Sequence, residues 1–379
     1  MKILQVLPAL DAGGVERGTV EMVQAIVGAG GTALVASAGG RQVAAVERAG
    51  GQHIQLNLMT KDPVNILLNA GKLARLIRSE NISLVHARSR APAWSAYLAA
   101  RRTQTPFVTT WHGVYGEDFP GKRLYNSVMA RGDRVIAISH YIGNRVAAHG
   151  VPPSRLRIIP RGVDPDIFDP ARISGDRVHR LAEAWRIPTG ARIVMLPARL
   201  TRWKGAEALL DAVARLPAHD NLFCVLVGSD QGRTRYAASL TARAESLGLT
   251  PRLRLAGHCD DMQAALMLAD VVVSTSLKPE PFGRTVIEAQ AMGRPVVAFH
   301  HGGAAETIRD GQTGLLVPPG DIGALAAAID HALTLEDAAR AARAYQARTA
   351  VLAGFTTAAM QSATLAVYRE LLAAPVLAA

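Results

Sequence analysis

The sequence predicts an α/β protein built from two doubly wound, Rossmann-like domains that face each other across a cleft. Three observations support this prediction. Short apolar runs alternate with longer amphipathic segments along most of the 379 residues. The alternation pauses once, at a proline-rich segment over residues 160–190, and then restarts. Hydrophobic residues make up 49% of the chain and charged residues 19%, which is enough apolar side chain to fill two cores.

In the first half, runs of four to six aliphatic residues predict parallel strands, because buried strands of such sheets are apolar on both faces. The expected strands are 2–7, 32–37, 83–86, 106–110 and 134–138. Amphipathic segments between them predict helices, which include 15–29, 64–79 and 121–131. This order of strand and helix is the βαβ rhythm of a parallel sheet.

The second half repeats the rhythm after the 160–190 segment, whose middle at 176–186 is expected to be helical. The expected strands are 191–196, 222–227, 252–255, 270–274, 295–298 and 314–317. From residue 320 onward the sequence is rich in alanine and predicts helices only. We therefore divide the chain into domains 1–165 and 166–379, and allow the last helix to cross back to the first domain.

The positive charge lies almost entirely in the first half. The chain carries a formal charge of +11, yet residues 1–160 hold 19 Lys and Arg against 9 Asp and Glu, and the rest hold 23 against 22. Charge alone suggests a nucleic-acid-binding protein. Against that alternative, no stacking aromatic residues interleave with the cations and no nucleic-acid-binding motif occurs.

Cysteine usage and hydropathy exclude further classes. Two cysteines rule out a disulfide framework and a four-cysteine zinc site. The opening MKILQVLPALDAGG is too short an apolar run for a signal peptide, and no stretch of 18 uncharged apolar residues predicts a transmembrane helix. We expect the protein in the cytoplasm, bound to a membrane only at its surface.

Two candidate site features follow strands in the first half. Gly13 and Gly14 follow the first strand, where backbone amides at a helix start can approach an anion; a plain tight turn is the alternative. The string AGGVERG lacks the G-x-G-x-x-G spacing, which weakens a nicotinamide-cofactor interpretation. His112 follows strand 106–110 and is expected at the ligand edge of the sheet, with a buried structural histidine as the alternative.

Cations and carboxylates follow strands in the second half. Arg199 and Lys204 come after strand 191–196, where a forked guanidinium and an ammonium can meet on one pyrophosphate. Glu280 lies in a loop, and Glu288 lies inside the helix expected to start near Gly283. Two carboxylates can accept hydrogen bonds from hydroxyls at two ends of one ligand, with phosphate at the helix start between them. Ordinary surface charges are the alternative for each, although a glutamate deep in an apolar helix is costly without a partner.

Taken together, these residues resemble family 4 of the retaining glycosyltransferases, which have the GT-B fold. The resemblance covers nearly the whole chain and also includes IPRGVD at 159–164, Gly228-Ser229, the E-x7-E pair 280/288 and HGGAAE…DGQTGLLVPPGD at 301–321. The strings HARSRAPAWSA and PGKRLYNSVMARGDRVIAIS are most similar to lipopolysaccharide-core glycosyltransferases of Gram-negative bacteria. Arg161 stands where the family usually has Asn, and Pro281 where it has Gly; Arg161 is expected to alter hinge or acceptor contacts.

The resemblance implies an activity and a role for each residue. It implies transfer of a hexose, with mannose as the best match, from a nucleotide-diphosphate sugar to a lipid-linked or lipopolysaccharide-core acceptor at the cytoplasmic membrane face. Domain 1–165 would bind the acceptor and domain 166–379 the donor. His112 and Glu280 would be catalytic, beside the transferring sugar and on its hydroxyls. The donor would be bound by Gly13, Gly14, Arg199, Lys204, Phe282, Gly283, Arg284 and Glu288.

The resemblance implies retention by same-face attack, and the lack of a carboxylate that can be nominated as nucleophile near the anomeric carbon agrees with it. Asp164 and Asp166 spell D-x-D, which binds metal in other glycosyltransferases, but they lie in the proline-rich segment and are interpreted as a turn. No essential metal and no cofactor is expected.

The basic residues of the first half are candidates for the acceptor or membrane surface. Lys72, Arg75 and Arg78 recur at three-residue spacing and share one helix face, while Arg88 and Arg90 follow a strand end. Lys122 and Arg123 add two more cations. Such a set suits anionic lipid headgroups or a phosphorylated acceptor, and a solvated helix face is the alternative.

Two questions stay open from the sequence. Sugar-nucleotide 2-epimerases share the fold and need no acceptor, so they are the alternative enzyme class. The sequence also does not fix the base of the donor: the resemblance makes GDP-mannose the first candidate and UDP-hexoses the second.

Overall fold

The computed structural model describes residues 1–11, 13–217 and 221–373, which form two compact units. Unit 1 comprises Met1–Arg161 together with Thr357–Ala379, and unit 2 comprises Gly162–Thr356. The expected boundary between residues 165 and 166 therefore falls inside unit 2, and the last helix belongs to unit 1 rather than to the domain that precedes it.

Unit 1 is built on a seven-stranded parallel sheet in the order β3-β2-β1-β4-β5-β6-β7. The strands are β1 (Lys2–Val6), β2 (Thr32–Ser37), β3 (Gln52–Gln55), β4 (Leu84–Ala87), β5 (Phe107–Trp111), β6 (Arg134–Ala137) and β7 (Leu156–Ile158). The helices are α1 (Gly14–Gly28), α2 (Val43–Arg48), α3 (Pro63–Ser79), α4 (Arg90–Thr103), α5 (Pro120–Asn126), α6 (His140–Ala148) and α15 (Thr357–Ala373), with a 3-10 turn at Ser127–Ala130.

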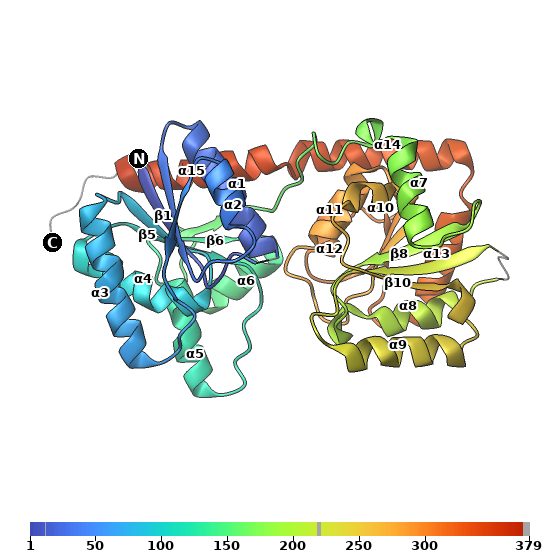
Figure 1. Ribbon diagram of the computed structural model, residues 1–379, viewed down its shortest axis with the longest axis horizontal. Helices are drawn as coiled ribbons and strands as arrows, with labels where there is room; N and C mark the ends of the chain where they lie inside the picture. Colours follow the sequence, from blue (N-terminus) through green and yellow to red (C-terminus); the bar gives the residue numbers. More distant parts are fainter. Residues whose placement is uncertain (12, 218–220, 374–379) are drawn as a thin grey trace. The chain divides into compact units, whose positions relative to one another are not determined.

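Helices cover both faces of this sheet. Figure 1 shows α1 and α15 on one face and α3, α4 and α5 on the other. Ile3, Leu84 and Val108 point from the strands toward α1 and α15 and form one core with them. The sequence at the start of α3 explains why the helix begins there: the Asp62 side chain accepts a hydrogen bond from the Asn65 N–H at 2.8 Å, and a proline follows this cap.

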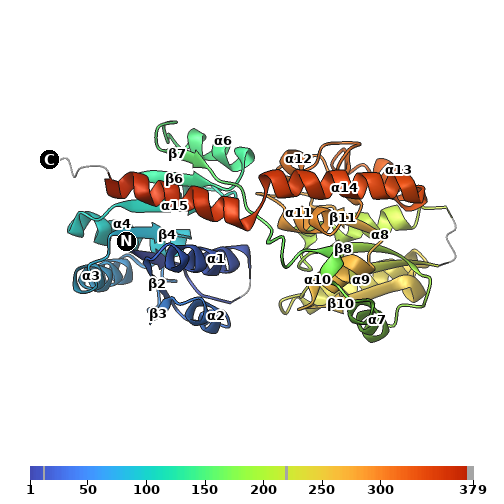
Figure 2. The same cartoon turned by 90° about the horizontal axis from the view of Figure 1, so that it is seen from above.

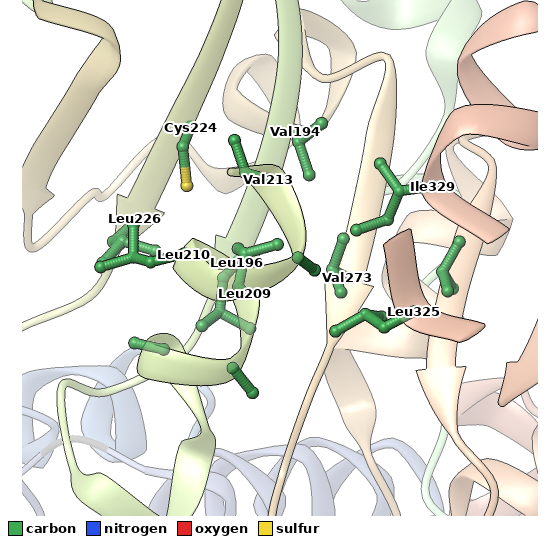
Figure 3. Close-up of a cluster of buried hydrophobic side chains, with 14 of the residues drawn as sticks. Val194, Leu196, Leu209, Leu210, Val213, Cys224, Leu226, Val273, Leu325 and Ile329 are labelled. Atoms are coloured by element: carbon green, nitrogen blue, oxygen red, sulfur yellow. The ribbon is translucent and has the colours of Figure 1, made fainter. Parts of the chain in front are cut away.

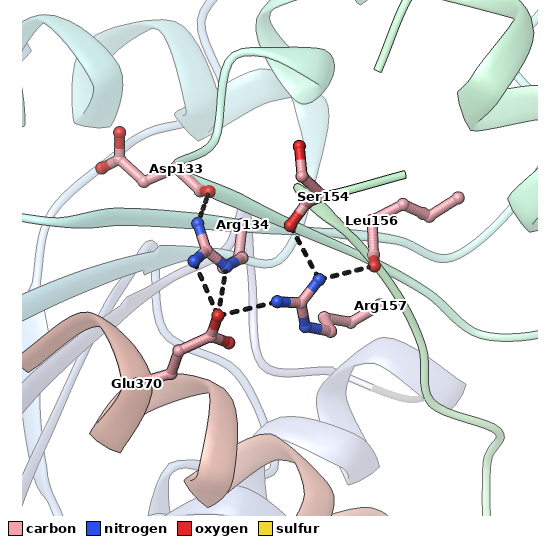
Figure 4. Close-up of polar contacts among 6 residues, drawn as sticks. All are labelled: Asp133, Arg134, Ser154, Leu156, Arg157 and Glu370. Atoms are coloured by element: carbon pink, nitrogen blue, oxygen red, sulfur yellow. Dashed lines mark hydrogen bonds and ion pairs between the residues drawn. The ribbon is translucent and has the colours of Figure 1, made fainter. Parts of the chain in front are cut away.

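The last helix, α15, is fastened to unit 1 by polar contacts as well as by its core residues. One Glu370 oxygen accepts hydrogen bonds from the Arg134 guanidinium at 2.6 and 3.0 Å and from Arg157 at 2.7 Å (Figure 4). Tyr368 is fully buried, and its hydroxyl lies 2.6 Å from His86 Nδ1. Both views of the chain show α15 alongside α1, which it contacts (Figure 2).

Unit 2 is built on a six-stranded parallel sheet in the order β10-β9-β8-β11-β12-β13. The strands are β8 (Arg192–Pro197), β9 (Leu222–Val227), β10 (Leu253–Gly257), β11 (Val271–Ser274), β12 (Val296–Phe299) and β13 (Leu315–Val317). The helices are α7 (Gly175–Ala184), α8 (Ala206–Val213), α9 (Thr234–Ser246), α10 (Met262–Leu268), α11 (Arg284–Ala291), α12 (Ala304–Thr307), α13 (Ile322–Thr334) and α14 (Asp337–Gly354). Three 3-10 turns lie at Pro170–Arg172, Arg202–Lys204 and Thr250–Arg252.

The core of unit 2 lies between its sheet and α8, α9 and α13. Val194 and Val273 from the strands meet Leu209 of α8 and Leu325 of α13, all of them buried (Figure 3). Helices α10, α11, α12 and α14 cover the other face. Two parallel-sheet, Rossmann-like units confirm the predicted fold class.

The structure differs from the sequence prediction at the two edge strands of the unit 1 sheet and at one helix. Strands β3 and β7 were not among the expected strands. β3 reads QHIQ with both ends exposed and β7 has only three residues, so neither carries the apolar run of a central strand. The expected helix 121–131 is shorter, because α5 ends at Asn126 and a 3-10 turn follows it.

Candidate active site

Several candidate residues follow the strands at which the strand order reverses: Gly13, Gly14 and Arg88 in unit 1, and Arg199, Lys204 and Glu280 in unit 2. Ligands of doubly wound sheets bind outside the carboxyl ends of the strands at such a point. In unit 1 this switch point lies between β1 and β4, and in unit 2 between β8 and β11.

In unit 2, the loop after β8 carries the two expected cations. The Arg199 side chain is exposed, whereas Lys204 is largely covered and ends a 3-10 turn. Gly205 follows with φ of 71°, and a Cβ there would lie 1.9 Å from the Thr275 carbonyl oxygen. Thr275 also donates to the Gly205 carbonyl at 2.9 Å. The loop of Lys204 is therefore fixed against the residues that follow β11.

Glu280 sits at the centre of a buried polar cluster. One of its carboxylate oxygens receives both the Lys204 ammonium and the Ser276 hydroxyl. Only 8% of Glu280 is exposed. Its carbonyl accepts the Gly303 N–H at 2.8 Å, so the loop after β12 holds its backbone in place. Charge pairing and a hydroxyl donor offset the cost of burying this carboxylate.

The helix α11 begins directly beyond that cluster. Gly283 caps it with φ of 87° and no side-chain cap, so the amides of the first turn have no capping side chain. Glu288, on the second turn, is 6% exposed and lies 3.9 Å from the Arg284 Nε. Phe282 packs its ring against Phe355, so it can offer only its backbone to a ligand.

This arrangement can bind a ligand that is anionic at one end and rich in hydroxyls at the other. Arg199, Lys204 and the positive end of α11 suit phosphate oxygens, and Glu280 suits hydroxyl donors. The sequence interpretation missed Ser276, although it follows a strand end as the other site residues do. It also gave no role to His301. Burial lowers the pKa of His301, while a hydrogen bond with the Ser276 backbone and the charge of Glu280 act in the opposite direction and raise it.

In unit 1, His112 follows β5 as expected and is half-buried. The Arg161 guanidinium donates to its Nδ1. Burial, together with the charges of Arg161 and Arg88, holds the pKa of His112 well below its usual range. Because a guanidinium only donates, Nδ1 accepts and the neutral ring carries its proton on Nε2. His112 is therefore a neutral donor. Gly13 and Gly14 lie at the start of α1.

The basic residues of unit 1 do not form one continuous site. Lys72, Arg75 and Arg78 lie exposed on α3, as the spacing predicts. Arg123 on α5 is also exposed. A pocket of about 500 Å³ is lined by Lys61, Ser89, Arg90, Ala91, Gly116, Phe119, Gly121, Lys122 and Tyr125.

Contacts with neighbouring side chains hold two cations of this pocket in place. Arg90 donates to Asn126 at 2.9 Å and lies over the Tyr115 ring, and Lys122 pairs with Asp118. Arg88 differs from all the other cations, because it is 2% exposed and lies at the carboxyl end of β4. It is not part of the exposed basic surface.

Comparison with known proteins gives two matching family models. A model described as "Glycosyltransferase Family 4" matches residues 12–167, and one described as "Glycosyl transferases group 1" matches residues 179–349.

Three relatives illustrate the similarity. A glycosyltransferase of Rickettsia africae is 36% identical with a TM-score of 0.91, and the match covers 98% of each chain. HepE of Anabaena, solved with UDP and glucose, is 25% identical with a TM-score of 0.85 over 97% of this chain and 99% of its own. The D-inositol 3-phosphate glycosyltransferase of Mycobacterium bovis is 31% identical over 76% of this chain, and the chain spans only 61% of its length.

Proposed function

Because the chain belongs to the group 1 and family 4 glycosyltransferases, we propose that it transfers a hexose from a nucleotide-diphosphate sugar to an anionic, lipid-linked saccharide, with retention at the anomeric carbon. The cluster of Lys204, Glu280 and Ser276 beside the start of α11 is the observation that carries the proposal. It sets a phosphate-binding charge next to a hydroxyl-binding carboxylate, which are the two ends of a sugar diphosphate.

Each part of the cluster has a place in the reaction. Arg199 and Lys204 bind the diphosphate, and the first amides of α11 add their partial charge. Glu280 accepts hydrogen bonds from sugar hydroxyls, and Glu288 accepts those of the ribose. As the glycosidic bond breaks, negative charge grows on the leaving phosphate, and the preorganised cations stabilise that charge.

Retention follows from attack on the face that the diphosphate leaves. The leaving phosphate takes the acceptor proton, so the chain needs no general base at that point. His112 donates a hydrogen bond from Nε2 to the transferring sugar, and it stays neutral because burial, with the charges of Arg161 and Arg88, lowers its pKa. Charge neutralisation by Lys204 and Arg199 makes an essential metal unnecessary in this proposal.

We also propose that unit 1 docks on the surface of the membrane that holds the lipid-linked acceptor, and an apolar and basic surface on α3 supports this. Val64, Leu67 and Leu68 occupy the start of the exposed face of α3 and are 51–63% exposed. Lys72 and Arg75 continue the same face one turn and two turns on. Apolar side chains beside cations suit the boundary of an anionic bilayer, where each cation contributes about 1 kcal/mol. Within the described residues, none of the helices is long and apolar enough to cross a membrane.

Phe119, which caps α5, and Leu124 on α5 are each more than half exposed, and Phe119 lines the same pocket as Lys61, which lies just before α3. Sedimentation with phosphatidylglycerol vesicles tests the membrane docking. We expect Leu67→Ser with Leu68→Ser to lose most of the binding seen with the unsubstituted chain. The matched double change Ala341→Ser with Ala342→Ser, on α14 of unit 2, should keep it. Equal sedimentation of all three proteins contradicts the docking surface.

A donor screen followed by a transfer assay tests the reaction. Thermal shift with GDP-mannose, UDP-glucose, UDP-galactose and ADP-glucose identifies the base and sugar, with GDP-mannose as the first candidate. Labelled donor is then incubated with a membrane lipid extract. We expect product only with the acceptor present; conversion of the donor alone to its 2-epimer would favour the epimerase alternative.

Two substitutions test the site. Glu280→Ala and Lys204→Ala should abolish transfer while circular dichroism still reports a folded chain. Full activity of both purified variants would show that the cluster is not the donor site.

A further inference from the structure

The least compensated charge in unit 1 is Arg88. It is 2% exposed, and its Nε and Nη2 have no hydrogen-bond partner among the described residues. A buried guanidinium without a partner is costly, because it has lost its water and gained nothing in exchange. The charge of Glu21 favours the charged form of Arg88, and that carboxylate already pairs with Arg17 at 3.2 Å.

A second guanidinium lies beside the first. Arg161 is 4% exposed and donates to His112 and to the Met360 sulfur. A Cβ on Gly18 of α1 would lie 2.7 Å from Arg161 Nη1 and 2.9 Å from Arg88 Nη2. Both guanidinium groups thus converge on one bare point of α1, where only glycine leaves them room.

Apart from the Glu21 carboxylate, the titratable groups that face this pair are neutral. Burial and the two arginines lower the pKa of His86 and His112, and burial raises the pKa of Tyr368. Two buried guanidinium charges therefore lie together with a single carboxylate nearby, and Arg17 already pairs with that carboxylate. A bound anion would stabilise such a pair, and forked guanidinium groups match the oxygens of phosphate and carboxylate.

The position in the sheet supports the same conclusion. Arg88 directly follows β4, and the Gly13-Gly14 pair lies between β1 and the first turn of α1. The switch point of unit 1 lies between these two strands. Unit 2 uses its own switch point in the same way, with Arg199 and Lys204 after β8.

We infer that the switch point of unit 1 is an oxyanion site, in which Arg88 and Arg161 bind a phosphate or carboxylate group of a substrate. The site itself is defined by unit 1 alone; its assignment to a substrate of the transfer reaction rests on the proposed function. The oxyanion belongs either to the acceptor, as a phosphate or an acidic sugar, or to an acidic sugar of the donor.

Phosphate binding tests the site without any activity. The full chain carries Arg199→Ala with Lys204→Ala, so that inorganic phosphate cannot report the donor site. Thermal unfolding is followed in phosphate and in sodium chloride of equal ionic strength. We expect phosphate at about 100 times its Kd to raise the midpoint of unit 1 by roughly 5–10 °C.

Three variants in that background decide the result. Arg88→Met should remove the phosphate shift and, without phosphate, unfold at or above the temperature of its parent, because an uncompensated buried charge is gone. Arg88→Lys keeps the charge without the fork and should retain part of the shift. Arg48→Met, exposed in the last turn of α2 and outside every proposed site, should retain all of it. An equal phosphate shift in Arg88→Met and its parent overturns the site.

Two matched ligand pairs then identify the source of the oxyanion, in chains that keep Arg199 and Lys204. The donor pair is UDP-glucuronate and UDP-glucose, and the acceptor pair is methyl glucoside with and without a 6-phosphate. Arg88→Met should reduce the preference for the anionic member of one pair by roughly 10- to 100-fold. The pair affected names the source, and no change in either preference overturns the assignment to a substrate. Absence of transfer with every donor would contradict the proposed function and leave the phosphate result standing.

Discussion

Gly205 offers a sharp test of how the Lys204 loop is held. A methyl group there would lie 1.9 Å from the Thr275 carbonyl oxygen, which is backbone and cannot turn aside. Gly205→Ala must therefore move the loop or the end of β11. Two costs add: about 1–2 kcal/mol for an L-residue at φ of 71°, and about 1–3 kcal/mol for overpacking.

Gly248→Ala separates those two costs. Gly248 lies in the same unit at φ of 69°, and a Cβ there would meet nothing within 4 Å. Gly248→Ala therefore has only the cost of the backbone conformation and no cost of overpacking. For a unit of this size, 1 kcal/mol shifts the unfolding midpoint by about 2–4 °C. Calorimetry should therefore place Gly205→Ala roughly 2–12 °C below Gly248→Ala.

The same pair of variants separates stability from activity. A displacement of about 1 Å at Lys204 lowers kcat/KM by roughly 100-fold, whereas Gly248→Ala should keep the activity of the unsubstituted chain. Equal midpoints and equal kcat/KM for the two variants would refute both the close approach and its role in positioning Lys204.

Three further predictions concern titration and reactivity. NMR should find no protonation of His112 between about pH 6 and 8, and Arg161→Asn should raise its pKa because a neighbouring positive charge is lost; a ring titrating near 6.5 in the unsubstituted chain contradicts this. The pKa of Glu370 is lowered by its hydrogen bonds to two arginines, so its contribution to stability is present above the pKa of the unfolded chain and is lost as pH falls through the folded value. Glu370→Gln should therefore lower the unfolding midpoint at pH 7, and this loss should shrink as pH falls through the folded pKa; an equal loss at every pH would show that the charge is not responsible. Burial raises the pKa of the Cys224 thiol to about 12, so iodoacetamide should modify it only after unfolding, and rapid modification of the native chain would contradict its burial.

Much of the fold follows from the sequence because central strands are buried on both faces. β8 and β9 are continuous apolar runs, and the expected 222–227 agrees with β9 at both ends. β3 and β7 escape prediction because these two edge strands are short and half-exposed, so neither presents a continuous apolar run. The edge strands β10 and β13 of unit 2 are predicted, since the sequence expects 252–255 and 314–317.

Strand ends explain how much of the candidate site was predictable. Lys204 and Glu280 meet because the ends of β8 and β11 are neighbours in a parallel sheet, which their order implies. The hydroxyl of Ser276 at the same carboxylate depends on the turn between residues 276 and 280, which no periodicity describes. The burial of Arg88 was equally hidden, because a cation at a strand end is usually exposed, and its environment is made by a helix from elsewhere in the chain.

The return of α15 to unit 1 sets the order in which the newly made chain can fold. The hydroxyl of Tyr368 meets His86 across 282 positions, and all of unit 2 lies between them. At about 5–20 residues per second, the ribosome needs roughly 10–40 s to make unit 2 before α15 emerges. Unit 2 can thus complete its core first, while the face of the unit 1 sheet that receives Met360 and Leu365 waits uncovered. The nascent protein is most exposed to aggregation and to chaperones in that interval, and a ribosome that stops before the last helix leaves one finished unit attached to one unfinished unit.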